Sequence, residues 1–228
     1  MDRVVLSWSG GKDAAYALDR LRAAEVEVVG LLTTVDGGYD RSTMHGVRRE
    51  LYDRQADAIG LPLNQVVLPH EPSNDEYAAT MAAELARYRE RAVEAVAFGD
   101  LFLEDVRDYR QERLAEAGMT GRFPLWGMDT RAVATAVLDL GVSATVVAVD
   151  GDALDASFAG RPYDEGFLSD LPDGVDPCGE RGEFHTFVHD APYFDAPLPV
   201  AVGEVVTRSL EGGEYHYADL RLERATAR

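Results

Sequence analysis

The chain begins with a short apolar strand, a glycine turn and a helix. The segment Leu6-Ser-Trp-Ser-Gly-Gly-Lys-Asp13 joins the apolar run Val4–Trp8 to a stretch whose apolar residues recur at helical spacing. Glycines let backbone amides close around a phosphate, and the N-terminus of a helix adds partial positive charge. Lys12 in this turn is the only lysine of the 228 residues. The segment therefore predicts an anion-binding loop at the carboxyl end of the first strand.

The first half of the chain alternates strand and helix. The expected strands are Val4–Trp8, Val26–Thr34, Leu63–Leu68 and Val93–Phe98. The expected helices are the segment after the glycine turn, the segment from Val47 to Ile59, Asp75–Arg91 and Val106–Ala117. This rhythm predicts an α/β domain over residues 1–122, with a parallel sheet covered by helices on both faces.

The second half has a different pattern of strands and loops, and it predicts a smaller α/β subdomain over residues 123–228. A helix at Thr130–Leu140 and a strand at Ala144–Val149 precede a long segment rich in Gly, Pro and Asp. Three further strands are expected at Glu183–Val188, Val200–Leu210 and Glu214–Leu222. The last two flank Glu211-Gly212-Gly213, which suits a hairpin turn, so this half is expected to be more antiparallel.

The charge of the chain excludes several classes of function. Its 41 acidic and 22 basic residues give a net charge of −19, which repels nucleic acid. Low lysine with excess acid suits a salt-rich, halophilic cytoplasm, and a GC-rich genome that replaces Lys with Arg explains it equally well. No apolar run approaches the ~18–20 residues of a membrane span, and the N-terminus lacks the features of a signal peptide. One cysteine, Cys178, excludes an internal disulfide framework, so we expect a cytoplasmic protein.

The glycine turn differs from two common nucleotide-binding loops. A Walker A loop has four residues between its glycines and a Ser or Thr after the lysine, whereas Asp13 follows Lys12 here. The spacing is also not that of a dinucleotide-binding fold. We expect Lys12 and the helix N-terminus to neutralise phosphates and Asp13 to hold Mg²⁺ near them.

The motifs of this chain resemble those of a known family. Ser9-Gly10-Gly11-Lys12-Asp13 is similar to the loop of the PP-loop ATP pyrophosphatases, which split ATP between its α and β phosphates. Four further motifs, in order along nearly the whole chain, resemble the diphthine–ammonia ligase family. They are Met44-His45-Gly46, Gly99-Asp100, Pro124-Leu125-Trp126-Gly127 and Gly179-Glu-Arg-Gly-Glu-Phe-His-Thr-Phe187. Ala14 stands where the loop usually has Ser, so Ser7 or Ser9 must supply the missing hydroxyl, or the affinity for the nucleotide falls.

The resemblance implies an ATP-dependent ligase. ATP would activate a carboxylate as an acyl-adenylate with release of pyrophosphate, and ammonia would displace AMP to leave an amide. Diphthine on translation elongation factor 2 is the implied carboxylate. The implied nucleotide-binding residues are Ser7, Ser9, Gly10, Gly11, Lys12 and Asp13, with Asp13 also at the metal. The implied catalytic residues are Lys12, Asp13, Glu180 and Glu183, and the implied substrate-binding residues are His45, Asp100, Trp126, Glu180, Glu183 and His185.

Glu180 and Glu183 lie three residues apart in a glycine-bearing turn. From the residues alone they could hold Mg²⁺, position an amine or act as a base, and composition favours a solvated acidic turn. The resemblance favours a substrate-side role. His185 and His189 are too far apart along a strand to share a zinc ion.

Several further residues have two interpretations each. His45 and Asp100 follow predicted strands, and open α/β sheets bind ligands at the carboxyl ends of their strands. Trp126 would stack on adenine or pack between the subdomains, and packing is the favoured interpretation. Arg107, Arg110 and Arg113 form a row on one helix, which pairing with Glu104, Asp108 and Glu112 explains more simply than an acid-binding patch.

Two alternatives to the diphthine ligase stay open. One is a PP-loop enzyme that acts on the carboxylate of a small metabolite. The other is a non-catalytic sensor of ATP or AMP, which Ala14 favours. The sequence does not identify the amine donor, and it leaves a homodimer open.

Overall fold

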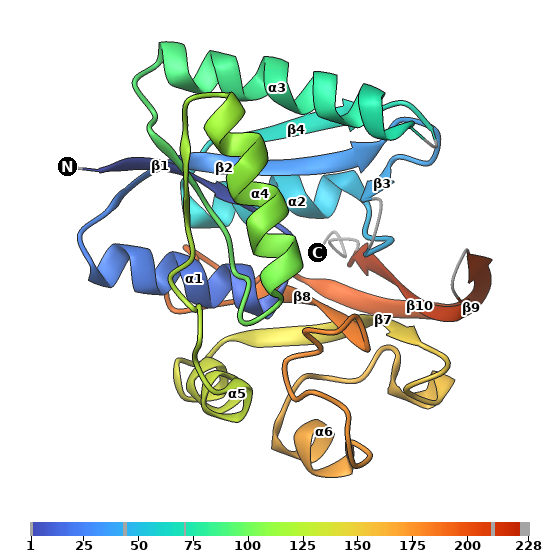
Figure 1. Cartoon of the computed structure of the whole chain (residues 1–228). Coiled ribbons are helices and arrows are strands. Elements are labelled where there is room, and N and C mark those ends of the chain that lie inside the picture. The colour runs from blue at the N-terminus through green and yellow to red at the C-terminus, as the bar shows by residue number, and fades with distance from the viewer. Residues whose placement is uncertain (1, 43–44, 71, 211–212, 224–228) are drawn as a thin grey trace, which may run out of the picture.

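The structure is a computed structural model that describes residues 2–42, 45–70, 72–210 and 213–223. Two β-sheets and the helices around them are stacked in layers (Figure 1). Helices α3 and α4 cover one face of the first sheet, and helix α1 lies between that sheet and the second one.

The first sheet is mainly parallel and has strands in the order β4-β2-β1-β5-β6. The central strand β1 is buried on both faces, as expected for a parallel strand between helical layers. The short strand β3 pairs antiparallel with the end of β2. The strands are β1 (Arg3–Ser7), β2 (Glu27–Asp36), β3 (Arg41–Ser42), β4 (Leu63–Leu68), β5 (Ala95–Ala97) and β6 (Thr120–Arg122).

Two helix ends of the first half have capping residues. Gly60 takes a left-handed conformation (φ 73°) and ends α2, while Ser73 and Glu76 form a capping box at the start of α3. The helices are α1 (Lys12–Ala23), α2 (Arg49–Ile59), α3 (Asn74–Glu90) and α4 (Glu104–Glu116). The predicted parallel sheet with helices on both faces is confirmed.

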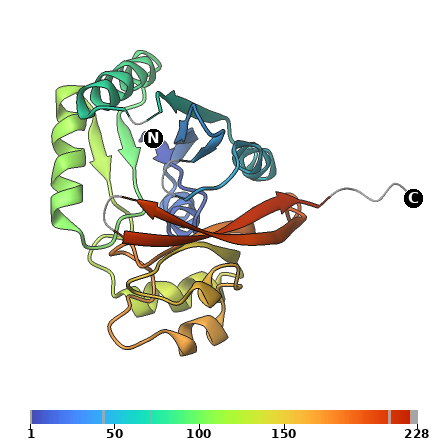
Figure 2. The ribbon, with the colours of Figure 1, turned by 90° about the vertical axis from the view of Figure 1, so that its right-hand side faces the viewer.

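The second sheet is antiparallel and has the order β8-β7-β10-β9. The hairpin of β9 and β10 crosses the molecule between the first sheet and the helices of the second half (Figure 2). The strands are β7 (Ser143–Asp150), β8 (Phe184–Asp190), β9 (Val200–Leu210) and β10 (Gly213–Leu222), and the helices are α5 (Thr130–Asp139), α6 (Glu165–Asp170) and the 3₁₀ turn η1 (Ala156–Phe158). The antiparallel character expected for this half is confirmed, and residues 211 and 212 of the predicted turn lie outside the described residues.

A continuous apolar core joins the two halves. It includes Leu6 and Leu18 from the first half together with Val146 and Phe187 from the second. A second, smaller cluster lies between the first sheet and helices α3 and α4. The boundary between residues 122 and 123 stays a prediction. Within the described residues, no helix is both long and apolar enough to cross a membrane.

Candidate functional site

The PP-loop, Ser9–Asp13, is shaped by two glycines that cannot be replaced without movement. Gly10 has φ +75°, and a Cβ there would lie 2.8 Å from Tyr52 Cε1. A Cβ on Gly11 would lie 3.0 Å from the carbonyl oxygen of Thr186. The amide of Gly11 donates to Ser9 Oγ (3.3 Å), and helix α1 begins at Lys12. The loop therefore presents backbone at a helix N-terminus, as an anion site requires.

Lys12 is almost completely buried, with 1% of its surface exposed. Its Nζ donates to Asp13 Oδ2 (2.9 Å) and to the carbonyl oxygen of Cys178. It also lies over the rings of Tyr163 and Phe184, at 5.3 and 5.2 Å from their centroids. Burial opposes its charge most strongly, but Asp13, Cys178 and Glu180 together outweigh burial and raise the pKa of Lys12. The ammonium group is therefore held charged between the PP-loop and a loop of the second half.

Gln55 of α2 connects three segments that are distant in sequence. Its Oε1 accepts from Trp8 Nε1 (2.8 Å), and its Nε2 donates to the carbonyls of Gly10 (3.0 Å) and Val188 (2.6 Å). The side chain is fully buried. Helical periodicity marked Gln55 only as a position on the inner face of its helix, so its role was missed.

The loop Asp176–Glu183 leads into β8 and is braced by its own carboxylates. Glu183 is buried, and its two oxygens accept from the amides of Asp176 (3.0 Å) and Arg181 (2.9 Å). Asp176 Oδ1 accepts from the amide of Cys178 (2.8 Å). Both oxygens of Glu183 are thus engaged within the loop, which favours a positioning role for this side chain. Its predicted catalytic role stays a prediction.

Glu180 of the same loop reaches across to the first half. Its Oε1 accepts from the amide of Leu101 (2.7 Å), just beyond the end of β5. Burial, with further contributions from the nearby carboxylates of Asp13 and Asp100, raises the pKa of Glu180 to about 7. A carboxyl group that titrates near neutral pH suits proton transfer.

Asp13, Asp100 and Glu180 form a cluster of carboxylates beside the PP-loop. Burial raises the pKa of Asp13 despite the opposing charge of Lys12, and burial likewise raises the pKa of Asp100. Asp100 Oδ2 lies 3.1 Å from Arg110 Nε, but without hydrogen-bond geometry, and has no hydrogen-bond partner among the described residues.

These carboxylates fit the chemistry of Mg²⁺. Mg²⁺ prefers oxygen ligands and is often held by one or two carboxylates together with substrate phosphates. The unpartnered oxygen of Asp100 and the nearby Asp13 provide such donors. In the part of the chain that is described, no three His, Cys, Asp or Glu side chains are grouped to hold a metal by themselves. A bound ion would therefore depend on phosphate oxygens as well.

His45 and His185 are brought together from the two halves of the chain. Their ring centroids are 4.4 Å apart. Burial and the positive charge of Lys12 lower the pKa of His185 to about 4, and burial together with His185 lowers that of His45 well below its ordinary value. Both imidazoles are therefore neutral at pH 7.

Trp126 is half-buried and lies against α4. The guanidinium carbon of Arg107 lies 4.1 Å from its ring centroid, and Phe123 packs edge-on against it. Trp126 belongs to neither apolar cluster of the described residues and does not line the cavity below. Packing between the subdomains and stacking on adenine therefore both stay predictions.

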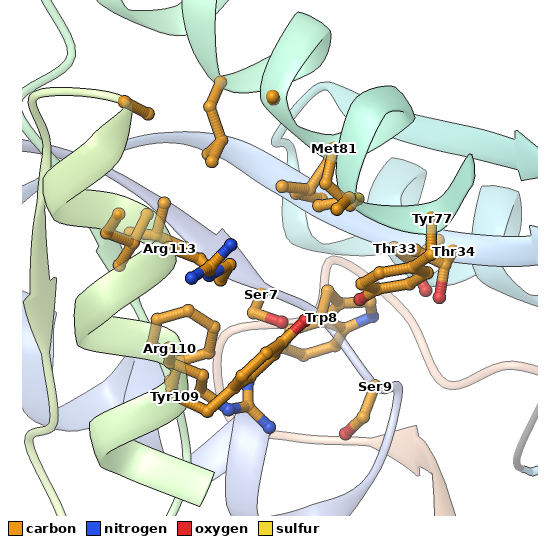
Figure 3. Close-up of a pocket in the computed structure, with 18 of the residues that line it drawn as sticks. Ser7, Trp8, Ser9, Thr33, Thr34, Tyr77, Met81, Tyr109, Arg110 and Arg113 are labelled. Carbon is orange, nitrogen blue, oxygen red and sulfur yellow. The ribbon is translucent and has the colours of Figure 1, made fainter. Parts of the chain in front are cut away.

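A cavity of about 1060 Å³ opens between α3, α4 and the carboxyl ends of β1 and β2 (Figure 3). Tyr77 and Met81 enter it from α3, and Arg110 and Arg113 from α4. Its polar floor consists of Ser7, Ser9, Thr33 and Thr34, and His45 also lines it. The size suits a nucleotide together with part of a second substrate.

The structure brings most of the predicted site residues together. Asp13, Asp100 and Glu180 cluster at the PP-loop, and His45 meets His185 next to it. Thr33 and Thr34 were missed, although the rule that ligands bind at strand ends indicates them. Tyr77, Tyr109 and Met81 were missed because charged helices give no sign of a cavity between them.

Comparisons with known proteins cover both halves of the chain. The profile of the diphthamide synthase N-terminal domain matches residues 1–120, and that of the diphthamide synthase C-terminal domain matches residues 129–217. A Bos taurus protein named diphthine–ammonia ligase is 26% identical over 233 residues, which cover 92% of this chain and 86% of the relative. Proteins of the same name from Danio rerio and Homo sapiens are each 25% identical, over 91% and 92% of this chain and 89% and 86% of the relatives. The resemblance drawn from the motifs is confirmed.

Proposed function

Because the chain belongs to the diphthamide synthase family, we propose that it is an ATP-dependent ligase that converts a carboxylate and ammonia into an amide. The curated relatives named diphthine–ammonia ligase support this class of enzyme. We further propose diphthine on elongation factor 2 as the carboxylate and an acyl-adenylate as the intermediate.

One observation carries the proposal: the loop Asp176–Glu183 and strand β8 contact the PP-loop directly. Lys12 donates from its side chain to the Cys178 carbonyl and from its amide to Thr186 Oγ1 (3.1 Å). The amide of Val188 donates to the Gly10 carbonyl (2.8 Å). These contacts support a single site that combines the nucleotide motif and the substrate-side motif, as a ligase with two substrates requires.

The PP-loop would hold the phosphates of ATP. The amides at the start of α1 and the charge of Lys12 would offset the negative charge that develops on departing pyrophosphate. Mg²⁺, when bound by Asp13 and Asp100, would supply further charge neutralisation. The substrate carboxylate would attack the α-phosphorus, and the bond between the α-phosphorus and the bridging oxygen would break.

Glu180 would act on the amine. At neutral pH ammonia is mostly ammonium, which must lose a proton before it can attack a carbonyl carbon. A Glu180 carboxylate with a pKa of about 7 can take that proton. Ammonia would then attack the acyl-adenylate, the amide would form and AMP would leave. Glu183 would keep the loop in shape through the amides of Asp176 and Arg181.

The direct test measures the products formed by purified protein from ATP, ammonium and elongation factor 2 that carries the unamidated histidine. We expect AMP, pyrophosphate and the amide in equal amounts. ADP and orthophosphate would contradict the mechanism.

Deletion of the gene, followed by mass spectrometry of the modified histidine, tests the substrate: a normal amide in the deletion strain would favour a small-metabolite ligase. Tight ATP binding without turnover would favour a nucleotide sensor.

A pair of variants separates the two ends of the site. Glu180→Gln and Glu183→Gln are expected to keep ATP binding and to lose amide formation. Titration calorimetry with ATP and the amide assay measure the two properties independently. Loss of ATP binding in a folded variant would place that carboxylate at the metal instead.

A further inference from the structure

The positive charges that face the cavity belong to arginines, Arg89 of α3 and Arg110 and Arg113 of α4, and not to the lysine of the PP-loop. Lys12 is buried between Asp13 and the Cys178 carbonyl and is not among the described residues that line the cavity. Arg110 and Arg113 do line it (Figure 3). In a chain with a net charge of −19, guanidinium groups in a cavity indicate an anionic ligand.

Arg110 lies at the flank of the PP-loop. A Cβ on Gly99 would be 2.9 Å from the carbonyl carbon of Asp13, so the end of β5 touches the start of α1. Asp100 follows directly, and its Oδ2 is 3.1 Å from Arg110 Nε. A polyphosphate that leaves the PP-loop towards the cavity would therefore meet this guanidinium group.

The bonding capacity of Arg110 is largely unused. The row of arginines was expected to pair with acidic residues of its own helix, and Arg107 does pair with Asp108 (3.5 Å) and Arg113 with Glu112 (3.9 Å). Arg110 instead contacts Asp100, without hydrogen-bond geometry, and its guanidinium carbon lies 4.3 Å from the centroid of the Phe98 ring. Among the described residues it forms no hydrogen bond, although a guanidinium group has five donors in a fixed fork. Phe98 holds the group flat and leaves its edge for an oxyanion.

We propose that Arg110 is a phosphate-binding residue of the nucleotide site, whose guanidinium group binds an oxyanion of the ATP triphosphate in the cavity. The inference rests on the proposed use of ATP and adds a residue from outside the PP-loop. Asp100 orients the guanidinium group and Phe98 supports it from one face. The acceptor carboxylate is the other oxyanion present, so the test must separate nucleotide phosphate from acceptor.

Titration calorimetry of the full chain with ATP and with adenosine tests the proposal without any turnover. Arg110→Gln is expected to weaken ATP binding about tenfold or more, the loss of one charge-assisted contact, and to change adenosine binding less than about twofold. Arg110→Lys keeps the charge but not the planar guanidinium group with its fixed donors, and it is expected to bind ATP more tightly than Arg110→Gln and less tightly than the wild type. Arg87→Gln makes the same charge change on α3, outside the cavity, and is the matched control.

A double variant excludes an indirect effect. Arg110→Gln leaves the Asp100 carboxylate without its cation, which could itself disturb the PP-loop. Arg110→Gln with Asp100→Asn removes both charges, and ATP binding is expected to be at least about tenfold weaker than in the Asp100→Asn single variant, which controls for the loss of a carboxylate at the proposed Mg²⁺ site. Unchanged ATP affinity in a folded Arg110→Gln variant, equal losses for ATP and adenosine, or equal affinity in the double variant and Asp100→Asn would overturn the proposal. Absence of ATP binding to the wild type overturns this inference and the ligase, whereas ATP binding without amide formation overturns the ligase alone.

Discussion

The two faces of the first sheet differ sharply in how they are covered. Helix α1 buries seven of its twelve residues between this sheet and the second one. Helix α3 buries two of seventeen residues, and α4 one of thirteen. The α1 face is therefore closed and tightly packed, whereas the α3–α4 face is open, charged and hollow.

This difference separates two tasks within one site. The closed face fixes the PP-loop, Lys12 and β8 through buried hydrogen bonds. The open face provides volume and exposed arginines for ligands. In the proposed site, the closed face positions the charges and the open face admits the ligands. Substitutions on the closed face and on the open face should therefore have different effects.

The largest expected effect is that of Lys12→Ala on the closed face. Loss of a preorganised charge should cost about 2–4 kcal/mol of transition-state stabilisation, or roughly a 30- to 1000-fold loss in kcat/KM for release of AMP and pyrophosphate. Arg87→Ala on the exposed surface of α3 is the control and should leave turnover unchanged. Equal turnover in Lys12→Ala and the wild type would remove the closed face from the chemistry.

The packing of the closed face can be tested with two glycines of equal conformation. Gly10 and Gly127 both have φ +75°, but a Cβ would lie 2.8 Å from Tyr52 at Gly10 and would meet nothing within 4 Å at Gly127. Gly127→Ala should cost about 1–2 kcal/mol from backbone strain alone, and Gly10→Ala about 1–3 kcal/mol more from crowding. Urea unfolding measures both. Equal losses would mean that the PP-loop is not confined by its neighbours.

Glu180 lies between the two faces and should link stability to pH. Burial raises its pKa to about 7, from an ordinary value of 4.5. Between about pH 4.5 and pH 7 the folded protein then binds more protons than the unfolded chain, so the contribution of Glu180 to the free energy of unfolding falls as pH rises. Glu180→Gln removes this pH dependence. The free energy of unfolding of the variant, relative to that of the wild type, should therefore increase as the pH rises from about 5 to about 8. Glu112→Gln on the exposed surface of α4 is the control. A difference that does not change with pH would show that Glu180 is not desolvated.

The smallest effect concerns the acidic surface as a whole. The acidic residues behind the net charge of −19 repel one another, and salt screens this repulsion. The screening length is about 30 Å at 0.01 M salt and about 3 Å at 1 M, so the repulsion is much weaker at 1 M. The melting temperature should rise by a few degrees, equivalent to about 1 kcal/mol, from about 0.05 to about 2 M KCl. A flat or falling curve would leave genome composition as the reason for the missing lysines.

Most of the fold follows from local patterns in the sequence. Apolar runs and helical periodicity predicted the long strands and helices, and the structure adds the residues that cap them, such as Ser73 at the start of α3. The strands β3 and β6, of two and three residues, were missed because so few residues have no periodicity.

The details of the site depend on contacts that local patterns do not contain. The Cys178 carbonyl that binds Lys12 is 166 residues away along the chain. Glu180 and Glu183 have the same residue type and similar surroundings in the sequence. Glu180 accepts a hydrogen bond from the amide of Leu101, whereas Glu183 accepts one from the amide of Asp176 in its own loop. Only the tertiary structure defines this difference.

The three buried hydrogen bonds of Gln55 restrict how the molecule can move. They join β1, the PP-loop and β8 through one side chain, so relative motion of these segments would leave several buried polar groups unpaired, at about 1–3 kcal/mol each. Gln55 therefore restricts the motion of the two sheets relative to one another. Helices α3 and α4 bury few residues, so we expect the proposed protein substrate to gain access by displacing these helices rather than by parting the sheets.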